Sequence, residues 1–226
     1  MSHYAVAVFS DDGDFDRLLK PYDENNRAEY EFEPVDYQEI VARFESFAKQ
    51  NNGWTLDMYL KNMGYIQRDG QWGYEHNPNG YWDWYSLDGR DYMYDAKNGA
   101  IRDSGVGAYR KNDIDWYADD PEAEADAEDF WDSFVGENAF AEPPGLWNKK
   151  YYLDRYGTKE QYVKEWKRTI PYAFITPDGV WHSAGRVGWF ATSDETAESA
   201  DRYAAEWDAW IASDANPYVN LVDCHI

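Results

Sequence analysis

An apolar segment with the alternation of a β-strand stands at each end of this chain. Tyr4–Phe9 carries small and β-branched apolar residues, and Tyr218–Ile226 places Val219 and Leu221 on one face, followed by Asp223 and His225. Helix patterns fill much of the interval, without a regular strand–helix–strand repeat. This order predicts an α+β fold: a single domain, 1–226, with a largely antiparallel sheet, both terminal strands in that sheet and helices packed on it.

Start and stop signals place the helices between these strands. Thr158 to Gln161 and Thr192 to Glu195 read as capping boxes at the start of two later helices. A hairpin is expected around Pro177-Asp178-Gly179, between strands at Tyr172–Ile175 and Val180–His182. The other predicted elements are short helices at Asp12–Leu19 and Leu56–Met63, a helix at Asp36–Gln50 with Ile40, Phe44 and Phe47 on one face, a meander of strands at Tyr65–Tyr94, and a helix at Pro121–Val135.

Acidic residues outnumber basic ones by 44 to 21, which leaves a formal net charge of −23. Such a surface repels phosphate backbones, so direct binding of nucleic acid is not expected. Twelve acidic residues and no Lys or Arg lie between Asp113 and Asn148. We interpret about 113–148 as an acidic lobe or flap, with a solvated helix face as the simpler alternative.

The ends of the chain and its one cysteine restrict the protein class further. Met1–Phe9 has neither a basic start nor a long apolar core, so no signal peptide is predicted, and no run is long enough to span a bilayer. Cys224 is the only cysteine, which excludes an intrachain disulfide framework. We therefore expect a soluble, intracellular protein without membrane contact.

The stretch from Asn77 to Arg90 is the strongest candidate for a binding site. It places four aromatic rings, an acid and an arginine between two turn signals. Read as a strand, it puts Trp82 and Trp84 on one face and Tyr85 on the other. Two indoles beside the Arg90 guanidinium can hold a flat or anionic ligand, whereas the simpler alternative is that the rings fill the core.

Further candidates come from cations near aromatic residues and from the hairpin. Arg110 and Lys111 stand out against the negative background, and either local acids hold them or they serve an anionic ligand. Trp181 and His182 follow the predicted hairpin turn. The predicted ligand-binding set is therefore Trp82, Trp84, Tyr85, Arg90, Arg110, Lys111, Trp181 and His182.

Catalytic signatures are mostly absent from the sequence. It has no phosphate-binding Gly-rich loop, no Gly-x-Ser-x-Gly motif and no His-Glu-x-x-His motif. Asp223 and His225 share a strand face and form a weak metal site if His182 lies beside them. We predict no catalytic residue, no cofactor and a protein that is not an enzyme.

Several short motifs resemble a family of tailed-bacteriophage and prophage accessory proteins. They span the chain in order: 4–9, 18–25, Asn-Pro-Asn-x-x-Trp-Asp-Trp-Tyr (77–85), Lys-Asn-Asp-Ile-Asp-Trp (111–116), Thr-Pro-Asp-Gly-x-Trp-His (176–182), Gly-Trp-Phe (188–190) and Val-Asp-Cys-His-Ile (222–226). The family pattern reads Gly-Gly-Arg-Trp where this chain has Asp88-Gly89-Arg90-Asp91, so the arginine is kept and the pocket shape differs. The resemblance implies a phage protein acting in the bacterial host cytoplasm.

In that setting, an aromatic and arginine pocket without catalytic groups favours counter-defence by capture of a small anionic, nucleotide-derived signal. Three alternatives remain open. They are an acidic nucleic-acid mimic that inhibits a host nuclease complex through a basic protein surface, a metal-assisted phosphodiesterase, and a carbohydrate-binding module.

Overall fold

A six-stranded sheet forms the centre of the computed structural model, which describes residues 3–87, 95–96, 99–100, 109–116, 121–136, 149–167, 170–187 and 193–226. Its strands are β1 (His3–Ser10), β5 (Trp84–Ser86), β8 (Tyr109–Arg110), β10 (Ala173–Ile175), β11 (Trp181–Ser183) and β12 (Tyr218–His225). The order is β11-β10-β1-β12-β5, and β8 also pairs with β12. The β1–β10 pair is parallel and the other pairs are antiparallel, which confirms the predicted α+β class.

The first and last strands pair along their whole length. His3 lies opposite His225 and Ser10 lies opposite Tyr218. Residues of β1 from Tyr4 onward are buried, because this strand lies inside the sheet and is covered on both faces. The prediction that both terminal strands share one sheet is confirmed.

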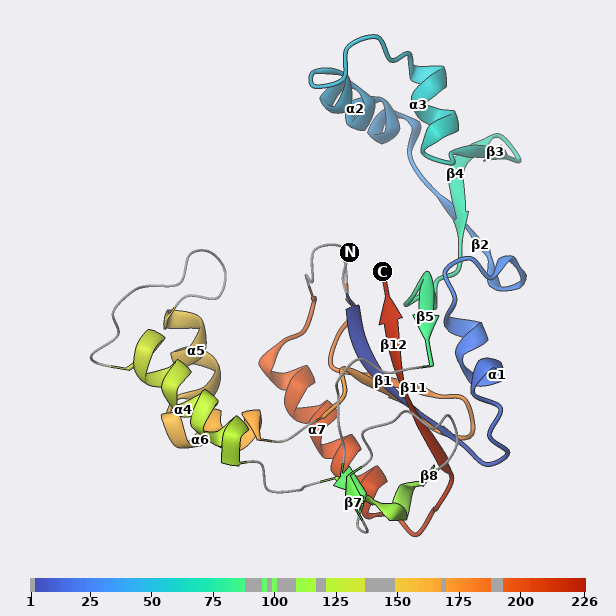
Figure 1. Cartoon of the computed structure of the whole chain (residues 1–226). Helices are drawn as coiled ribbons and strands as arrows, with labels where there is room; N and C mark the ends of the chain where they lie inside the picture. The colour runs from blue at the N-terminus through green and yellow to red at the C-terminus, as the bar shows by residue number, and fades with distance from the viewer. Residues whose placement is uncertain are drawn as a thin grey trace.

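Each face of this sheet has its own hydrophobic core. On one face, Val6, Val8 and Val222 pack with α1 (Phe15–Leu19) and the Trp82 indole. On the other face, Phe9 and Val219 pack with Tyr203 and Trp207 of α7 (Ala197–Ala212). Figure 1 shows α1 and α7 on opposite sides of β1 and β12. The alternation of the terminal strands therefore divides their side chains between two cores.

A first lobe projects from the sheet (Figure 1). It contains β2 (Glu31–Pro34), α2 (Tyr37–Ala48), α3 (Leu56–Asn62), β3 (Ile66–Arg68) and β4 (Gln71–His76), with β2, β4 and β3 in a sheet of their own. Ile40, Tyr59 and Leu60 form its buried centre. The predicted meander at Tyr65–Tyr94 is thus divided, because β3 and β4 belong to this lobe whereas β5 joins the central sheet.

A second lobe contains α4 (Pro121–Phe134), α5 (Lys149–Tyr156) and α6 (Lys159–Trp166). Ala127, Trp131 and Val135 pack there against Tyr162 and Val163. Of the predicted acidic lobe at about 113–148, Ile114 and Trp116 belong to the core under α7, and residues 117–120 and 137–148 lie outside the described residues. The remaining described elements are β6 (Asp95–Ala96), β7 (Gly99–Ala100), β9 (Ile114–Asp115) and the 3-10 turns Lys20–Tyr22, Arg27–Glu29 and Lys111–Asp113.

Local signals set most element boundaries. Thr158 caps α6 as predicted, with its hydroxyl accepting from the Gln161 N–H. The capping box of α7 is formed by Thr196 and Ser199, so the predicted start at Thr192–Glu195 is wrong by one helical turn. The β10–β11 hairpin is confirmed, and Gly179 adopts φ +85° in its turn.

Among the described residues, no helix is long and apolar enough to cross a membrane.

Candidate functional site

The loop before β5 is held against the turn that follows α1. Asn77 is buried, and its amide donates to the carbonyls of Pro21 (2.7 Å) and Asp23 (2.9 Å). Gly80 lies so close to this turn that an added Cβ would be 2.8 Å from the Cα of Glu24. The turn signal read from the sequence therefore fixes the loop at one end of the central sheet.

The three aromatic residues predicted as a pocket face different environments. Trp82 is 5% exposed and packs edge-on against Tyr85, with ring centroids 4.8 Å apart, whereas Trp84 is 55% exposed. Trp82 and Trp84 do not share a face, because β5 begins only at Trp84 and the preceding residues bond to other loops. Trp82 is therefore a core residue, which agrees with the simpler alternative that the rings of this stretch fill the core.

Tyr81 and Trp181 form the aromatic pair that this loop does build. Their rings are stacked, with centroids 4.7 Å apart and an interplanar angle of 4°. The Tyr22 ring packs against both, at 5.8 Å from Tyr81 and 5.0 Å from Trp181. The stack connects the loop to β11 and to the 3-10 turn Lys20–Tyr22, so three separate parts of the chain fix its position.

Arg186 covers the Tyr81 ring. Its guanidinium carbon is 5.2 Å from the ring centroid, and its N–H groups donate to the carbonyls of Pro78 and Gly80. Within the described part of the chain, no ion pair joins this guanidinium to a carboxylate. In a chain with a net charge of −23, an exposed arginine held by carbonyls keeps its charge available to an anion.

A hollow of about 380 Å³ lies beside this arginine. Arg202 reaches it from α7, and Thr196 and Ser199 line it at the start of that helix. Asp194 is the acid of the lining, and its carboxylate accepts from the backbone N–H of Arg186 at 2.6 Å. The hollow thus combines two guanidinium groups with hydroxyl groups at a helix N-terminus, which suits a negatively charged group.

Arg110 and Lys111 do not belong to this site. Arg110 lies over the Tyr218 ring at 4.0 Å and donates to the Asn216 carbonyl, at the other end of β12 from Trp84. Lys111 is fully buried, and its ammonium group donates to the carbonyls of Trp210, Ile211 and Ser213 and to the Ser213 hydroxyl. Burial lowers the pKa of Lys111. Lys111 closes the last turn of α7, so its role is structural.

His182 is separated from the other predicted metal ligands. It stacks on Phe174 at 4.4 Å, and its Nδ1 lies 3.1 Å from Glu206. Strands β10 and β1 lie between β11 and β12, so His182 cannot join Asp223 and His225. No group of three or more metal-binding side chains occurs among the described residues, so the condition for the weak metal site, that His182 lies beside Asp223 and His225, is not met.

Asp223 and His225 each pair with a residue other than His182. His3 lies 3.1 Å from Asp223, and His225 lies 2.5 Å from Asp83. The two imidazole centroids are 5.0 Å apart, at the same end of β1 and β12. Cys224 beside them faces the core, and burial raises the pKa of its thiol, as expected for an unreactive cysteine.

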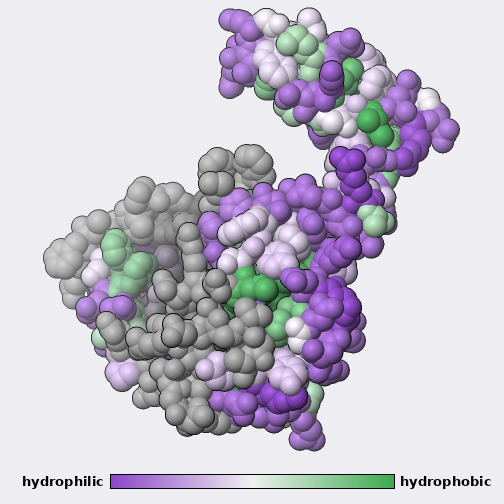
Figure 2. All heavy atoms as spheres, turned by 45° about the vertical axis from the view of Figure 1, so that its right-hand side comes forward, coloured by the Kyte–Doolittle hydropathy of each residue, from purple (hydrophilic) through white to green (hydrophobic). Residues whose placement is uncertain are grey.

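Of the predicted binding residues, Trp181 is the one that lies in the stack beside the hollow. Arg90 lies outside the described residues, as do 188–190 of the motif at Gly-Trp-Phe. Arg186 was not among the predicted residues, because no motif in the local sequence distinguishes it. Figure 2 shows hydrophilic side chains over much of the described surface on its face of the molecule.

Comparison of the chain with protein-family models, with curated proteins and with solved structures finds no match.

Proposed function

We propose that this protein captures a small anionic, nucleotide-derived ligand, with Arg186 as the residue that binds its phosphate. The observation that carries the proposal is the Arg186 guanidinium, which is held on the Tyr81–Trp181 stack and hydrogen-bonded to carbonyl groups. A planar guanidinium binds phosphate through paired hydrogen bonds, so a fixed orientation favours a phosphate ligand.

The aromatic stack supports the arginine and does not receive the ligand. One face of the Tyr81 ring is covered by Trp181 and the other by Arg186. A base therefore cannot stack on Tyr81. The ligand would place its phosphate on the outer edge of Arg186, with Arg202 in the same hollow.

The proposed setting is counter-defence by a bacteriophage in the cytoplasm of its host. It rests on the motif resemblance to phage accessory proteins. Capture lowers the concentration of a host signal in proportion to the protein present and requires no turnover. This agrees with a site made of arginine, hydroxyl and aromatic side chains.

The acidic helix α4 gives less support to nucleic-acid mimicry. Lys159 contacts Glu128 and Asp132 at 3.6 Å and 2.8 Å, and Lys167 contacts Glu124 at 2.7 Å. A mimic needs its carboxylates available to a basic partner, whereas these three are engaged within the lobe.

Equilibrium dialysis against a panel of linear, cyclic di- and cyclic trinucleotides tests the proposal. We expect at least one nucleotide to be retained at about one per site, with nucleosides lacking phosphate excluded. Retention of nucleosides and nucleotides alike, or of neither, would contradict a phosphate-directed site.

A further inference from the structure

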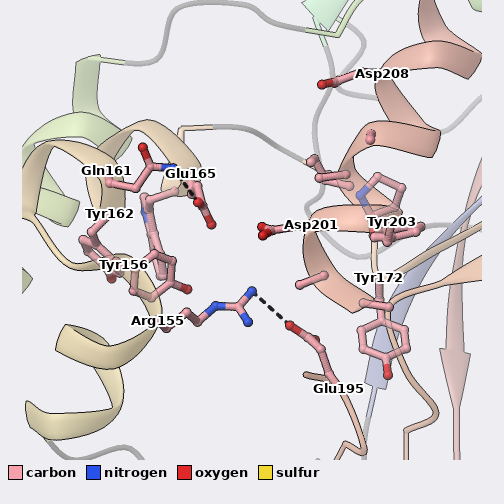
Figure 3. A pocket seen from close by; sticks show the side chains of 17 residues that line it. Arg155, Tyr156, Gln161, Tyr162, Glu165, Tyr172, Glu195, Asp201, Tyr203 and Asp208 are labelled. Atoms are coloured by element: carbon pink, nitrogen blue, oxygen red, sulfur yellow. Dashed lines mark hydrogen bonds and ion pairs between the residues drawn. The ribbon is translucent and has the colours of Figure 1, made fainter. Parts of the chain in front are cut away.

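A second, larger cleft of about 680 Å³ separates α6 from α7. Figure 3 shows side chains of both helices converging on it, with Arg155 and Glu195 joined across one end. This volume is in the range of sites that bind small molecules. Its lining rings are Tyr156, Tyr162, Trp166, Tyr172 and Tyr203.

The charges of this cleft are opposite to those of the Arg186 hollow. Four carboxylates line it, against the single cation Arg155. Asp201 points into the cleft from α7 and Glu165 points into it from α6 (Figure 3). Glu165 accepts from the Gln161 amide at 2.7 Å, and neither carboxylate has an ion pair with another described residue.

Arg155 shows how the cleft accommodates a cation. Its guanidinium carbon lies 5.3 Å from the Tyr156 ring centroid, and its Nη2 lies 3.0 Å from Glu195. The side chain is only 20% exposed, so this contact is largely removed from water. A ring face together with a carboxylate is the combination that binds organic cations.

We propose that this cleft is a binding site for an organic cation, an ammonium or guanidinium group on an apolar chain. Glu165 and Asp201 neutralise the cation, and the exposed ring of Trp166, which lines the same cleft, contacts the chain. The site is independent of the proposed nucleotide capture, because the four carboxylates repel phosphate.

The ligand chemistry has two sources, a free polyamine or a basic side chain of a peptide. Isothermal titration with spermidine, agmatine and a short Lys- and Arg-containing peptide distinguishes them. N,N′-Diacetylputrescine, in which both amines are converted to uncharged amides, serves as the neutral control ligand. We expect cation binding that weakens with salt and no binding of the neutral ligand.

The decisive variant is Glu165→Gln with Asp201→Asn, which keeps the shape of the cleft and removes two charges. We expect it to weaken cation binding at least about tenfold, while Glu45→Gln on the exposed face of α2 leaves binding unchanged. Equal loss in Glu45→Gln would show a general charge effect. That result, or the absence of binding by all three cations at millimolar concentration, would overturn the proposal.

Thermal unfolding of each variant provides the folding control. Nucleotide retention in the double variant separates the two sites, because we expect it to be unchanged while cation binding falls. A simultaneous loss of both ligands in a folded variant would contradict two independent sites.

Discussion

The Tyr81 ring lies parallel to the Trp181 indole, with centroids 4.7 Å apart and an interplanar angle of 4°. One residue precedes β5 and the other opens β11, at distant positions in the chain. Arg186 lies over the outer face of Tyr81, so the stack fixes a guanidinium at the rim of the hollow. This relationship connects the fold to the proposed phosphate site.

Trp82→Ala tests the assignment of Trp82 to the core. Because this indole is 5% exposed and packs against Tyr85, its removal leaves a cavity. We expect the free energy of unfolding to fall by about 3–5 kcal/mol. Trp84→Ala is the matched control, because Trp84 is 55% exposed. We expect this substitution to lower the free energy of unfolding by less than about 1 kcal/mol. Urea denaturation measures both, and equal losses would place Trp82 outside the core.

Lys111→Met tests the cap on α7. Methionine keeps the apolar stem but leaves the carbonyls of Trp210, Ile211 and Ser213 without the ammonium donor. The Trp210 carbonyl keeps the Ser213 N–H and hydroxyl as donors, but the other two carbonyls lose the ammonium group. Each buried carbonyl without a partner costs about 1–3 kcal/mol, so we expect the free energy of unfolding to fall by about 2–4 kcal/mol once removal of the buried charge is included. Lys61→Met, on an exposed position of α3, is the control. A Lys111→Met protein as stable as wild type would refute the capping role.

The burial of Tyr4 makes the stability of the protein depend on pH in the alkaline range. Burial raises the pKa of Tyr4 above its usual value of 10, whereas the unfolded chain releases this proton near pH 10. Above that pH the unfolded state binds fewer protons than the folded state, so stability falls as pH rises, by about 1.4 kcal/mol per pH unit for one such group. Tyr4→Phe should reduce this slope in denaturation curves between pH 9 and 11.

At neutral pH, we expect Tyr4→Phe to lower the free energy of unfolding by about 1 kcal/mol, because the Tyr4 hydroxyl donates a hydrogen bond to the Tyr81 carbonyl. An unchanged alkaline slope in the variant would show that other tyrosines determine the transition.

Mass balance tests capture against hydrolysis. After incubation with a retained nucleotide, heating the protein should release that nucleotide unchanged and in stoichiometric amount. His225→Ala should leave this outcome unchanged, although His225 and Asp83 are paired at 2.5 Å. Product in excess of protein, suppressed by EDTA or lost in His225→Ala, would replace capture with a phosphodiesterase activity.

The parts of the fold predicted from sequence are those specified by local patterns. Strict alternation identified β1 and β12, and Pro177-Asp178-Gly179 identified the hairpin. The start of α7 was misplaced because Thr192 and Thr196 both have a suitable residue three positions later, and only Thr196 caps the helix. Local sequence cannot choose between two such caps when packing decides where the helix begins.

The candidate site was predicted less well because it depends on contacts between distant segments. Trp181 was in the predicted set, but its partner Tyr81 was not, because the stack joins two segments that are distant in the sequence. Arg186 gave no motif, since its role comes from carbonyls of residues more than a hundred positions away. His182 was grouped with β12 because sequence does not show that two strands separate them.

Titration of wild type and Arg186→Gln with the nucleotide retained in dialysis tests the central claim most directly. Arg43→Gln, an exposed arginine on α2 paired with Glu39, is the matched control for loss of one positive charge. We expect Arg186→Gln to weaken binding by about ten- to a hundredfold and Arg43→Gln to change it less than about twofold. Equal affinity of the wild type and a folded Arg186→Gln protein would contradict a phosphate site at Arg186.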